Sequence, residues 1–263
     1  MGEILISFTA FSLTLVSAII LTHFCIKAAL KLDFLDYPRG RKNHVSPTPL
    51  LGGVAIYLAL FSGIYCPVVI STIWPDILMD KFSFSSQIIT GAIKKLPLLN
   101  VIFFTGLGLL IIGLIDDKKG MNPYLKLFFQ ILAGSIMYFF GIKITLFVKN
   151  EIFSYIATTF WFVLLINSFN LLDNMDGLSA GIAMVITILM FFISHFFNNF
   201  LMSFFCAAIA GALLGFLVFN FYKLLGIADS AFRPESLSKP SCHDYANAHY
   251  YTCKILFLLL NNN

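Results

Sequence analysis

The stretch NSFNLLDNMDGL, residues 167–178, separates two long apolar segments, residues 152–166 and 178–195, that we expect to cross a bilayer. Two asparagines and two aspartates recur in it at a spacing of three: Asn167, Asn170, Asp173 and Asp176. Residues three apart share a face of a helix or helical turn. Amide and carboxylate oxygens held together at a membrane edge suit a hard metal ion and a phosphorylated substrate. The alternative is an ordinary polar connection between helices, in which Asn, Asp and Gly are common.

The composition of the whole chain predicts a membrane protein. Of its 263 residues, 59% are hydrophobic and 11% are charged, and the mean hydropathy is +0.89, whereas a soluble domain carries about 25% charged residues. We therefore predict an all-α, polytopic membrane protein with cytoplasmic catalytic loops. The net charge is only +4 and the basic residues lie in short connections, which indicates topology signals and no nucleic-acid partner.

About seven transmembrane helices are expected, because each needs about 20 mostly apolar residues. The candidates are residues 4–30, 50–72, 98–115, 124–142, 152–166, 178–195 and 200–221. If the helices alternate in direction, the connections after the first, third and fifth share one face. Basic residues follow the first and third helices, so the positive-inside rule puts this face in the cytoplasm. We expect a multi-pass protein of the cell (inner) membrane, with residues 1–222 as a single transmembrane domain.

A second polar island, DYPRGRKNHVSPTP at residues 36–49, is followed by Gly52 and Gly53. Its prolines and glycines predict a stiff, non-helical segment. Arg41, Lys42 and His44 can face an anionic group, and arginine binds phosphate bidentately. On charge alone, an ordinary positive-inside loop is the alternative, and the bracketing prolines and glycines favour a shaped one.

A third island begins with Asp116 and Asp117 at the cytoplasmic end of the third helix, followed by basic residues at Lys118, Lys119 and Lys126. Adjacent carboxylates do not face the same way on a helix, so one can reach a metal while the other accepts a proton or orients a ligand. The helix dipole disfavours carboxylates at a C-terminus. A compensating cation is therefore needed, and either a metal or the lysines could supply it. Together with the carboxylates of residues 167–178, this pair could hold Mg²⁺.

These three islands resemble the motifs of the polyprenyl-phosphate N-acetylhexosamine-1-phosphate transferases, or glycosyltransferase family 4, over about residues 30–222. The family pattern resembles D-x-P-x-x-R-K-x-H-x-x-P-T-P-x-x-G-G, then D-D, then N-x-x-N-x-x-D-x-x-D-G-L. Matching residues are Asp36, Pro38, Arg41, Lys42, His44, Pro47, Thr48, Pro49, Gly52, Gly53, Asp116, Asp117, Asn167, Asn170, Asp173, Asp176, Gly177 and Leu178. The first motif is closer to the N-acetylglucosamine-type branch than to the peptidoglycan branch.

The resemblance implies transfer of N-acetylhexosamine-1-phosphate from a UDP-N-acetylhexosamine to polyprenyl (undecaprenyl) phosphate, with release of UMP. This would be the first membrane step of a cell-envelope polysaccharide of the O-antigen, teichoic acid or peptidoglycan type. The implied cofactor is Mg²⁺, with Mn²⁺ as an alternative, and a homodimer is left open. Implied catalytic residues are Asp116, Asp117, Asp173 and Asp176, with Asp117 and Asp173 holding the metal. Implied substrate-binding residues are Arg41, Lys42, His44, Lys126, Asn167 and Asn170.

The sequence departs from the family pattern after Tyr222, where Ser, Pro, Cys, His, Tyr and Asn replace Phe, Leu and Ile. The family continues with further helices and a Gly-Asp-x-Gly-Ser motif. One back-translation of residues 223–229, shifted by two bases, encodes Gly-Asp-Ser-Gly. We therefore expect residues 223–263 to be an aberrant tail, out of frame or disordered. An inactive truncated homologue is the main alternative. A small transporter is less favoured, because the charges lie at the membrane edge and not at its midplane.

Overall fold

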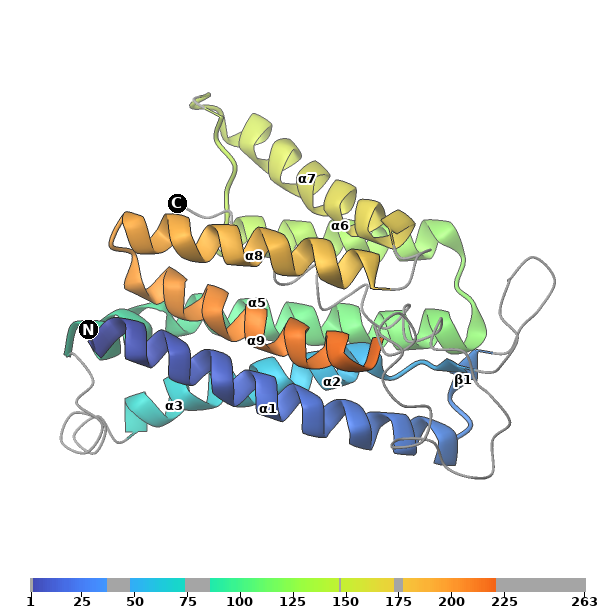
Figure 1. Cartoon of the computed structure of the whole chain (residues 1–263). Helices are drawn as coiled ribbons and strands as arrows, with labels where there is room; N and C mark the ends of the chain where they lie inside the picture. The colour runs from blue at the N-terminus through green and yellow to red at the C-terminus, as the bar shows by residue number, and fades with distance from the viewer. Residues whose placement is uncertain (1, 37–47, 74–85, 147, 173–176, 221–263) are drawn as a thin grey trace.

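The computed structural model describes residues 2–36, 48–73, 86–146, 148–172 and 177–220, and most of these residues are helical (Figure 1). The helices are α1 (Gly2–Lys31), α2 (Gly52–Leu60), α3 (Cys66–Ile73), α5 (Ser86–Lys119), α6 (Pro123–Phe139), α7 (Glu151–Leu172), α8 (Leu178–Phe196) and α9 (Phe200–Asn220). A π-helical turn, η1 (Phe61–Tyr65), joins α2 to α3, and two short strands, β1 (Leu35–Asp36) and β2 (Thr48–Pro49), pair with each other. The prediction of an all-α fold is confirmed. The predicted tail, residues 223–263, lies outside the described residues.

Each of the seven predicted spans coincides with a helical segment, with α2, η1 and α3 together forming the second. In the described part of the chain, five helices are long and apolar enough to cross a membrane by length and composition: α1, α5, α7, α8 and α9. Helices α5 and α7 extend well beyond the predicted ranges 98–115 and 152–166. The apolar pattern marks only the part of a helix that lipid would surround, whereas backbone hydrogen bonding continues into the polar ends.

Successive helical segments run in opposite directions, as the alternation predicted (Figure 1). The C-terminal ends of α1, α5, α7 and α9 therefore lie at one end of the bundle, on the right in Figure 1, with β1 and the starts of α6 and α8. We call this the motif end, because the predicted motifs border it. The opposite end holds the start of α1 and the α6–α7 connection.

Helix α9 occupies the centre of the bundle, where it packs against α1, α8 and α2. Almost every residue from Phe205 to Asn220 is buried. Close packing with α1 depends on two glycines of α9. A Cβ at Gly211 would collide with the carbonyl of Phe11, and one at Gly215 would lie 2.6 Å from the carbonyl oxygen of Leu15. Small residues allow such close backbone approach between membrane helices.

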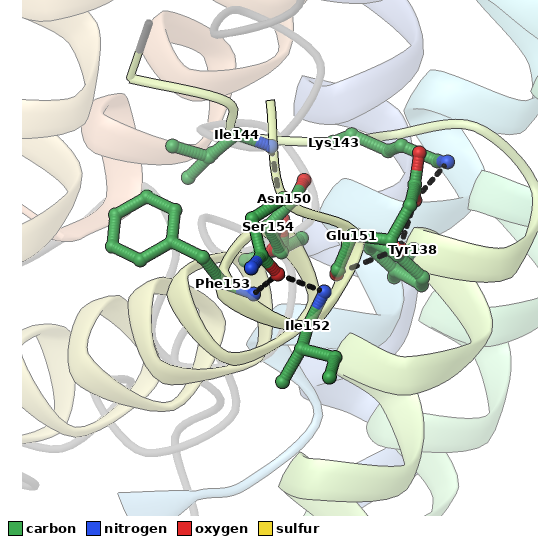
Figure 2. Close-up of polar contacts among 9 residues, drawn as sticks. Tyr138, Lys143, Ile144, Asn150, Glu151, Ile152, Phe153 and Ser154 are labelled. Atoms are coloured by element: carbon green, nitrogen blue, oxygen red, sulfur yellow. Dashed lines mark hydrogen bonds and ion pairs between the residues drawn. The ribbon is translucent and has the colours of Figure 1, made fainter. Parts of the chain in front are cut away.

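The α6–α7 hairpin is held at the opposite end by a group of polar contacts (Figure 2). Asn150 caps α7, because its Oδ1 accepts hydrogen bonds from the backbone N–H groups of Ile152 and Phe153 at 2.9 and 3.1 Å. The Nζ of Lys143 lies 2.8 Å from Oε2 of Glu151, and the Tyr138 hydroxyl also donates to that carboxylate. This hydrogen bond to Glu151 raises the pKa of Lys143 above its ordinary value. The hairpin is thus fixed at the end away from the predicted motifs.

Candidate functional site

The two strands hold the ends of the first motif beside α5. Leu35 pairs with Pro49 and Asp36 with Thr48, in antiparallel register. β1 packs against α5, and the Nζ of Lys118 lies 5.1 Å from the ring centroid of Phe34 as a cation–π contact. The predicted phosphate-binding residues Arg41, Lys42 and His44 lie outside the described residues. The described residues on either side of them, Asp36 and Thr48, pair with each other, and Asp36 belongs to the strand that packs against α5.

Asp116 lies in that last turn of α5 and accepts hydrogen bonds on both carboxylate oxygens. Its Oδ2 lies 2.7 Å from the Nζ of Lys126, and its Oδ1 lies 2.9 Å from the backbone nitrogen of Met121. The ion pair is partly buried, with side-chain exposures of 19% for Asp116 and 20% for Lys126. The cation that compensates the carboxylate at this helix end is therefore Lys126 of α6, and not the adjacent lysines of α5.

The short α5–α6 turn explains why these two side chains meet. Gly120 has φ +70°, a conformation that favours glycine, and its N–H donates to the carbonyl of Asp116 at 2.8 Å. Asn122 then caps α6 by accepting a hydrogen bond from Tyr124 N at 2.9 Å, and Pro123 occupies the first helical turn. This turn reverses the chain and lays the first turns of α6 against the end of α5.

Asp117 has a different environment from Asp116. Its side chain is half-buried, and its Oδ2 is shielded from solvent. The two carboxylates differ because adjacent residues point about 100° apart around a helix. The two adjacent carboxylates therefore have distinct environments, and their two chemical roles stay a prediction.

Asn167 and Asn170 lie on α7, not in the loop after it, since α7 continues to Leu172. The Asn167 Nδ2 donates to Oε1 of Gln130 and to the carbonyl of Val163, both at 2.8 Å. Gln130 belongs to α6 and is only 2% exposed. Asn170, three residues further on, is exposed. The first asparagine therefore ties α7 to α6, while the second is accessible.

Gln130 is the residue that the sequence reasoning left without a role. Its spacing from Lys126 could have indicated a role, because residues four apart lie on the same face of a helix. That face of α6 contacts Asp116 of α5 through Lys126 and Asn167 of α7 through Gln130. One helix face therefore connects the second and third motifs.

Asp173 and Asp176, the remaining predicted catalytic residues, lie outside the described residues. The structure resumes at Gly177, which is buried, has φ +66° and precedes α8. The N–H of Gly181 donates to the carbonyl of Gly177 at 2.7 Å, so the helix starts directly after the motif. The Gly177 conformation gives a physical reason for a glycine at this place.

The described part of the chain contains no group of three His, Cys, Asp or Glu side chains close enough to hold a metal ion. It does place carboxylate and amide oxygens, those of Asp117 and Asn170, in the last turns of α5 and α7 at the motif end. Mg²⁺ binds through one or two carboxylates together with waters and substrate phosphates. The donor types present therefore fit such an ion, with Asp173 as the predicted second carboxylate.

Known proteins resemble this chain over the helices that carry these residues. Residues 99–229, which run from α5 through α9, match the family model described as glycosyl transferase family 4. Over these residues the chain is similar to glycosyl transferase family 4. The matched range contains both aspartates of α5, Lys126 and the whole of residues 167–178.

Proteins similar to this chain carry related names. The chain is 25% identical to a probable undecaprenyl-phosphate N-acetylglucosaminyl 1-phosphate transferase of Bacillus subtilis, over 87% of this chain and 60% of the relative. It is 29% identical to a decaprenyl-phosphate N-acetylglucosaminephosphotransferase of Mycobacterium tuberculosis, over 79% of this chain and 53% of the relative. It is 30% identical to a phospho-N-acetylmuramoyl-pentapeptide-transferase of Streptococcus thermophilus, over 42% of this chain and 37% of the relative. The chain spans roughly half the length of such relatives, from 48% to 60% for the most extensive matches.

Proposed function

We propose that this protein transfers N-acetylhexosamine-1-phosphate from a UDP-sugar to polyprenyl phosphate at the cytoplasmic face of a bacterial inner membrane. A phosphate oxygen of the lipid attacks the β-phosphorus of the UDP-sugar. The bond from that phosphorus to the bridging oxygen breaks, and UMP leaves with the electron pair. The products are polyprenyl-diphospho-N-acetylhexosamine and UMP. Relatives named for N-acetylglucosamine make UDP-N-acetylglucosamine the first donor to test.

The observation that carries this proposal is the joining of two motifs through one face of α6. Lys126 pairs with Asp116 at 2.7 Å, and Gln130 pairs with Asn167 at 2.8 Å. The ends of the first motif are held at the same helix end by β1 and β2. A reaction between a lipid phosphate and a soluble nucleotide sugar needs its polar groups where the bilayer meets water, and the motif end supplies them.

Different residues are expected to perform different parts of the reaction. Asp116 is held by Lys126 and Met121 on both oxygens, so we assign it the positioning of Lys126. Lys126 binds a substrate phosphate as a point charge. Asp117 is then the better candidate to orient the lipid phosphate or accept its proton. Arg41, Lys42 and His44 would contact phosphate or sugar groups.

Magnesium is the proposed cofactor, with Asp117 and Asp173 as its protein ligands. Asn170 precedes Asp173 by three residues in the same motif. When bound, the magnesium ion would neutralise negative charge on the diphosphate and on the departing UMP. Asn167 would hold the end of α7 in place through its bond to Gln130. We leave a homodimer as a further proposal.

The test is a transferase assay with radiolabelled UDP-N-acetylglucosamine, polyprenyl phosphate and Mg²⁺, using the protein in membranes and extracting the lipid-linked product. We expect Asp117→Asn and Lys126→Met each to lower the rate at least ~100-fold, by analogy with the loss of one charge-stabilising group in other enzymes. Lys94→Met is the matched control, because Lys94 is an exposed lysine of α5 at the start of its apolar span. Its activity should equal that of wild type.

Two results would contradict the proposal. Near-normal turnover in Asp117→Asn would remove that residue from the site. No lipid-linked product from the wild-type protein with any UDP-N-acetylhexosamine, despite normal membrane insertion, would favour a non-catalytic homologue. The transporter alternative is disfavoured by the described charged side chains, which lie at the ends of the apolar spans or in connections.

A further inference from the structure

An apolar groove of about 410 Å³ runs between α5 and α6. Its α5 side extends from Asn100 to Ile112 and its α6 side from Phe129 to Phe140. Twelve residues of helix span about 18 Å along the axis, which compares with about 15 Å for the hydrocarbon of one leaflet. The groove is open on one side, because the lining residues Phe104, Leu132 and Phe140 are 65%, 44% and 61% exposed. Its length and lining suit a single acyl chain.

A glycine creates part of this space. Gly108 lines the groove, and a Cβ added to it would meet no atom within 4 Å. Larger residues at this position can therefore enter the groove without displacing backbone. This makes Gly108 the position at which the groove can be filled selectively.

Positive charge lies above the groove at the motif end. Lys119, the last residue of α5, is exposed and follows Ile112 by seven residues, which places both on the same face of the helix. The separation along the axis is about 10 Å, a distance that a lysine side chain and a glycerol phosphate can bridge together. The neighbouring carboxylate of Asp116 is already paired with Lys126.

The groove lies on a different side of α6 from Gln130, which holds Asn167. Lys126, Gln130 and Gly134 recur at intervals of four, and a Cβ at Gly134 would lie 3.1 Å from Cα of Thr159 on α7. The groove residues Phe129, Ala133 and Ile136 of α6, and Phe140 just after it, follow a stripe that passes close to Lys126 and is turned away from Gln130 and Gly134. A molecule in the groove would therefore lie on another side of α6 from Asn167.

We propose that the α5–α6 groove binds an acyl chain of an anionic phospholipid, whose headgroup phosphate is held by Lys119. Basic residues between transmembrane helices on the cytoplasmic side recognise such headgroups, and lysine keeps its charge in the interface while its stem lies along apolar surface. The groove length favours a membrane phospholipid over the much longer polyprenyl chain. The bound lipid fills the open side of the α5–α6 pair and supports the helix end that carries Asp116. This site does not depend on the proposed transferase activity.

Native mass spectrometry of the purified 263-residue protein, titrated with dioleoyl phosphatidylglycerol or dioleoyl phosphatidylcholine, tests the proposal. Wild type should bind phosphatidylglycerol about fivefold more tightly, and Lys119→Ala should remove this preference, since one lysine near an anionic surface contributes about that factor. Lys31→Ala, which changes the exposed last residue of α1 at the same end of the bundle, is the matched control and should keep it. Gly108→Leu should weaken binding of both lipids at least about tenfold, the loss for about two buried methylene groups. Gly91→Leu, at another α5 glycine with no neighbour within 4 Å of an added Cβ, should have no effect.

Several outcomes would overturn the proposal. Unchanged binding in Gly108→Leu would exclude the groove, and unchanged selectivity in Lys119→Ala would exclude the headgroup contact. Displacement of phosphatidylglycerol by an equimolar polyprenyl phosphate would assign the groove to the acceptor lipid. Dimer masses that disappear in Gly108→Leu would assign it to a second copy of the chain. Dihexanoyl phosphatidylglycerol, too short to reach Gly108, should bind wild type and Gly108→Leu equally, which separates loss of the groove from loss of the fold.

Discussion

At the end of α5, two adjacent carboxylates have different neighbours although they differ by one position in the chain. Asp116 is engaged by Lys126 and by the backbone of Met121, whereas Asp117 is turned away around the helix. From the sequence, the two roles of this pair were expected, but not which carboxylate takes which. The α5–α6 turn decides which of them pairs with Lys126, because Gly120 and Asn122 bring Lys126 back to Asp116.

The ion pair between Asp116 and Lys126 can be tested with a double-mutant cycle. Asp116→Asn and Lys126→Met should each destabilise the detergent-solubilised protein, and the double variant should be destabilised by less than their sum. The expected coupling energy is about 1.5–3 kcal/mol, the range for a hydrogen bond to a charged group. Thermal unfolding followed by fluorescence-detected size exclusion measures it, at about 2–4 °C per kcal/mol for a chain of this size. Strict additivity would show that the two side chains do not interact.

Helix packing depends on where small residues fall. Gly211 and Gly215 of α9 face α1 so closely that no side chain fits between the backbones. Hydropathy alone could not reveal this contact, because α1 and α9 are both strongly apolar. Their burial nevertheless differs: 28% of the α1 span is buried, against 72% of the α9 span. The spacing of four between the two glycines could have indicated this close helix contact.

The glycines of α9 give the first prediction at the scale of elements. Gly211→Ala and Gly215→Ala should each cost about 1–3 kcal/mol, because the added methyl groups force α1 and α9 apart. Gly181→Ala on the neighbouring α8 is the matched control, since an added Cβ there meets nothing within 4 Å. Thermal unfolding of the three variants should separate the first two from the third. Equal stability of all three would mean that α1 does not pack on α9 in this way.

The α6–α7 hairpin gives a second prediction about helix packing. Glu151→Gln should lower the unfolding temperature at neutral pH, because it removes the partner of Lys143 and Tyr138. The pKa of Lys143 is raised in the folded protein, so its contribution is present below the pKa of an unfolded lysine, about 10.4, and is lost as pH rises through the folded value. The difference from wild type should therefore shrink in strongly alkaline buffer. Lys149→Met, which changes an exposed lysine of the same connection, should match wild type at every pH.

On the scale of the whole molecule, alternating helix directions place all the described motif residues at one end of the bundle (Figure 1). Helix α7 packs against α6, and α6 packs against α5, so α6 links the motif residues of α5 to those of α7. The reaction proposed for this end requires it to face the compartment that contains the nucleotide sugar.

Cysteine accessibility tests this orientation. In a background without the five native cysteines, Leu32→Cys and Lys119→Cys at the motif end should resist an impermeant thiol reagent added outside intact cells. Lys149→Cys and Phe197→Cys, exposed positions at the opposite end, should be labelled. All four should react after the cells are opened. Labelling of Lys119→Cys from outside would show that the motif end faces the outside of the cell, opposite to the expected orientation.

The sequence by itself determined the seven helical segments, because a run of about 20 apolar residues in lipid must satisfy its backbone hydrogen bonds as a helix. It also determined which polar residues border the motif end, since charged and amide groups are costly inside the hydrocarbon. Only the tertiary structure decided that α9 lies at the centre, that Lys126 pairs with Asp116 and that Gln130 holds Asn167. Lipid chains are as apolar as leucine, so hydropathy cannot distinguish a helix face buried in protein from one facing lipid. Pairings between helices depend on the rotation of each helix, and only packing with its neighbours fixes that rotation.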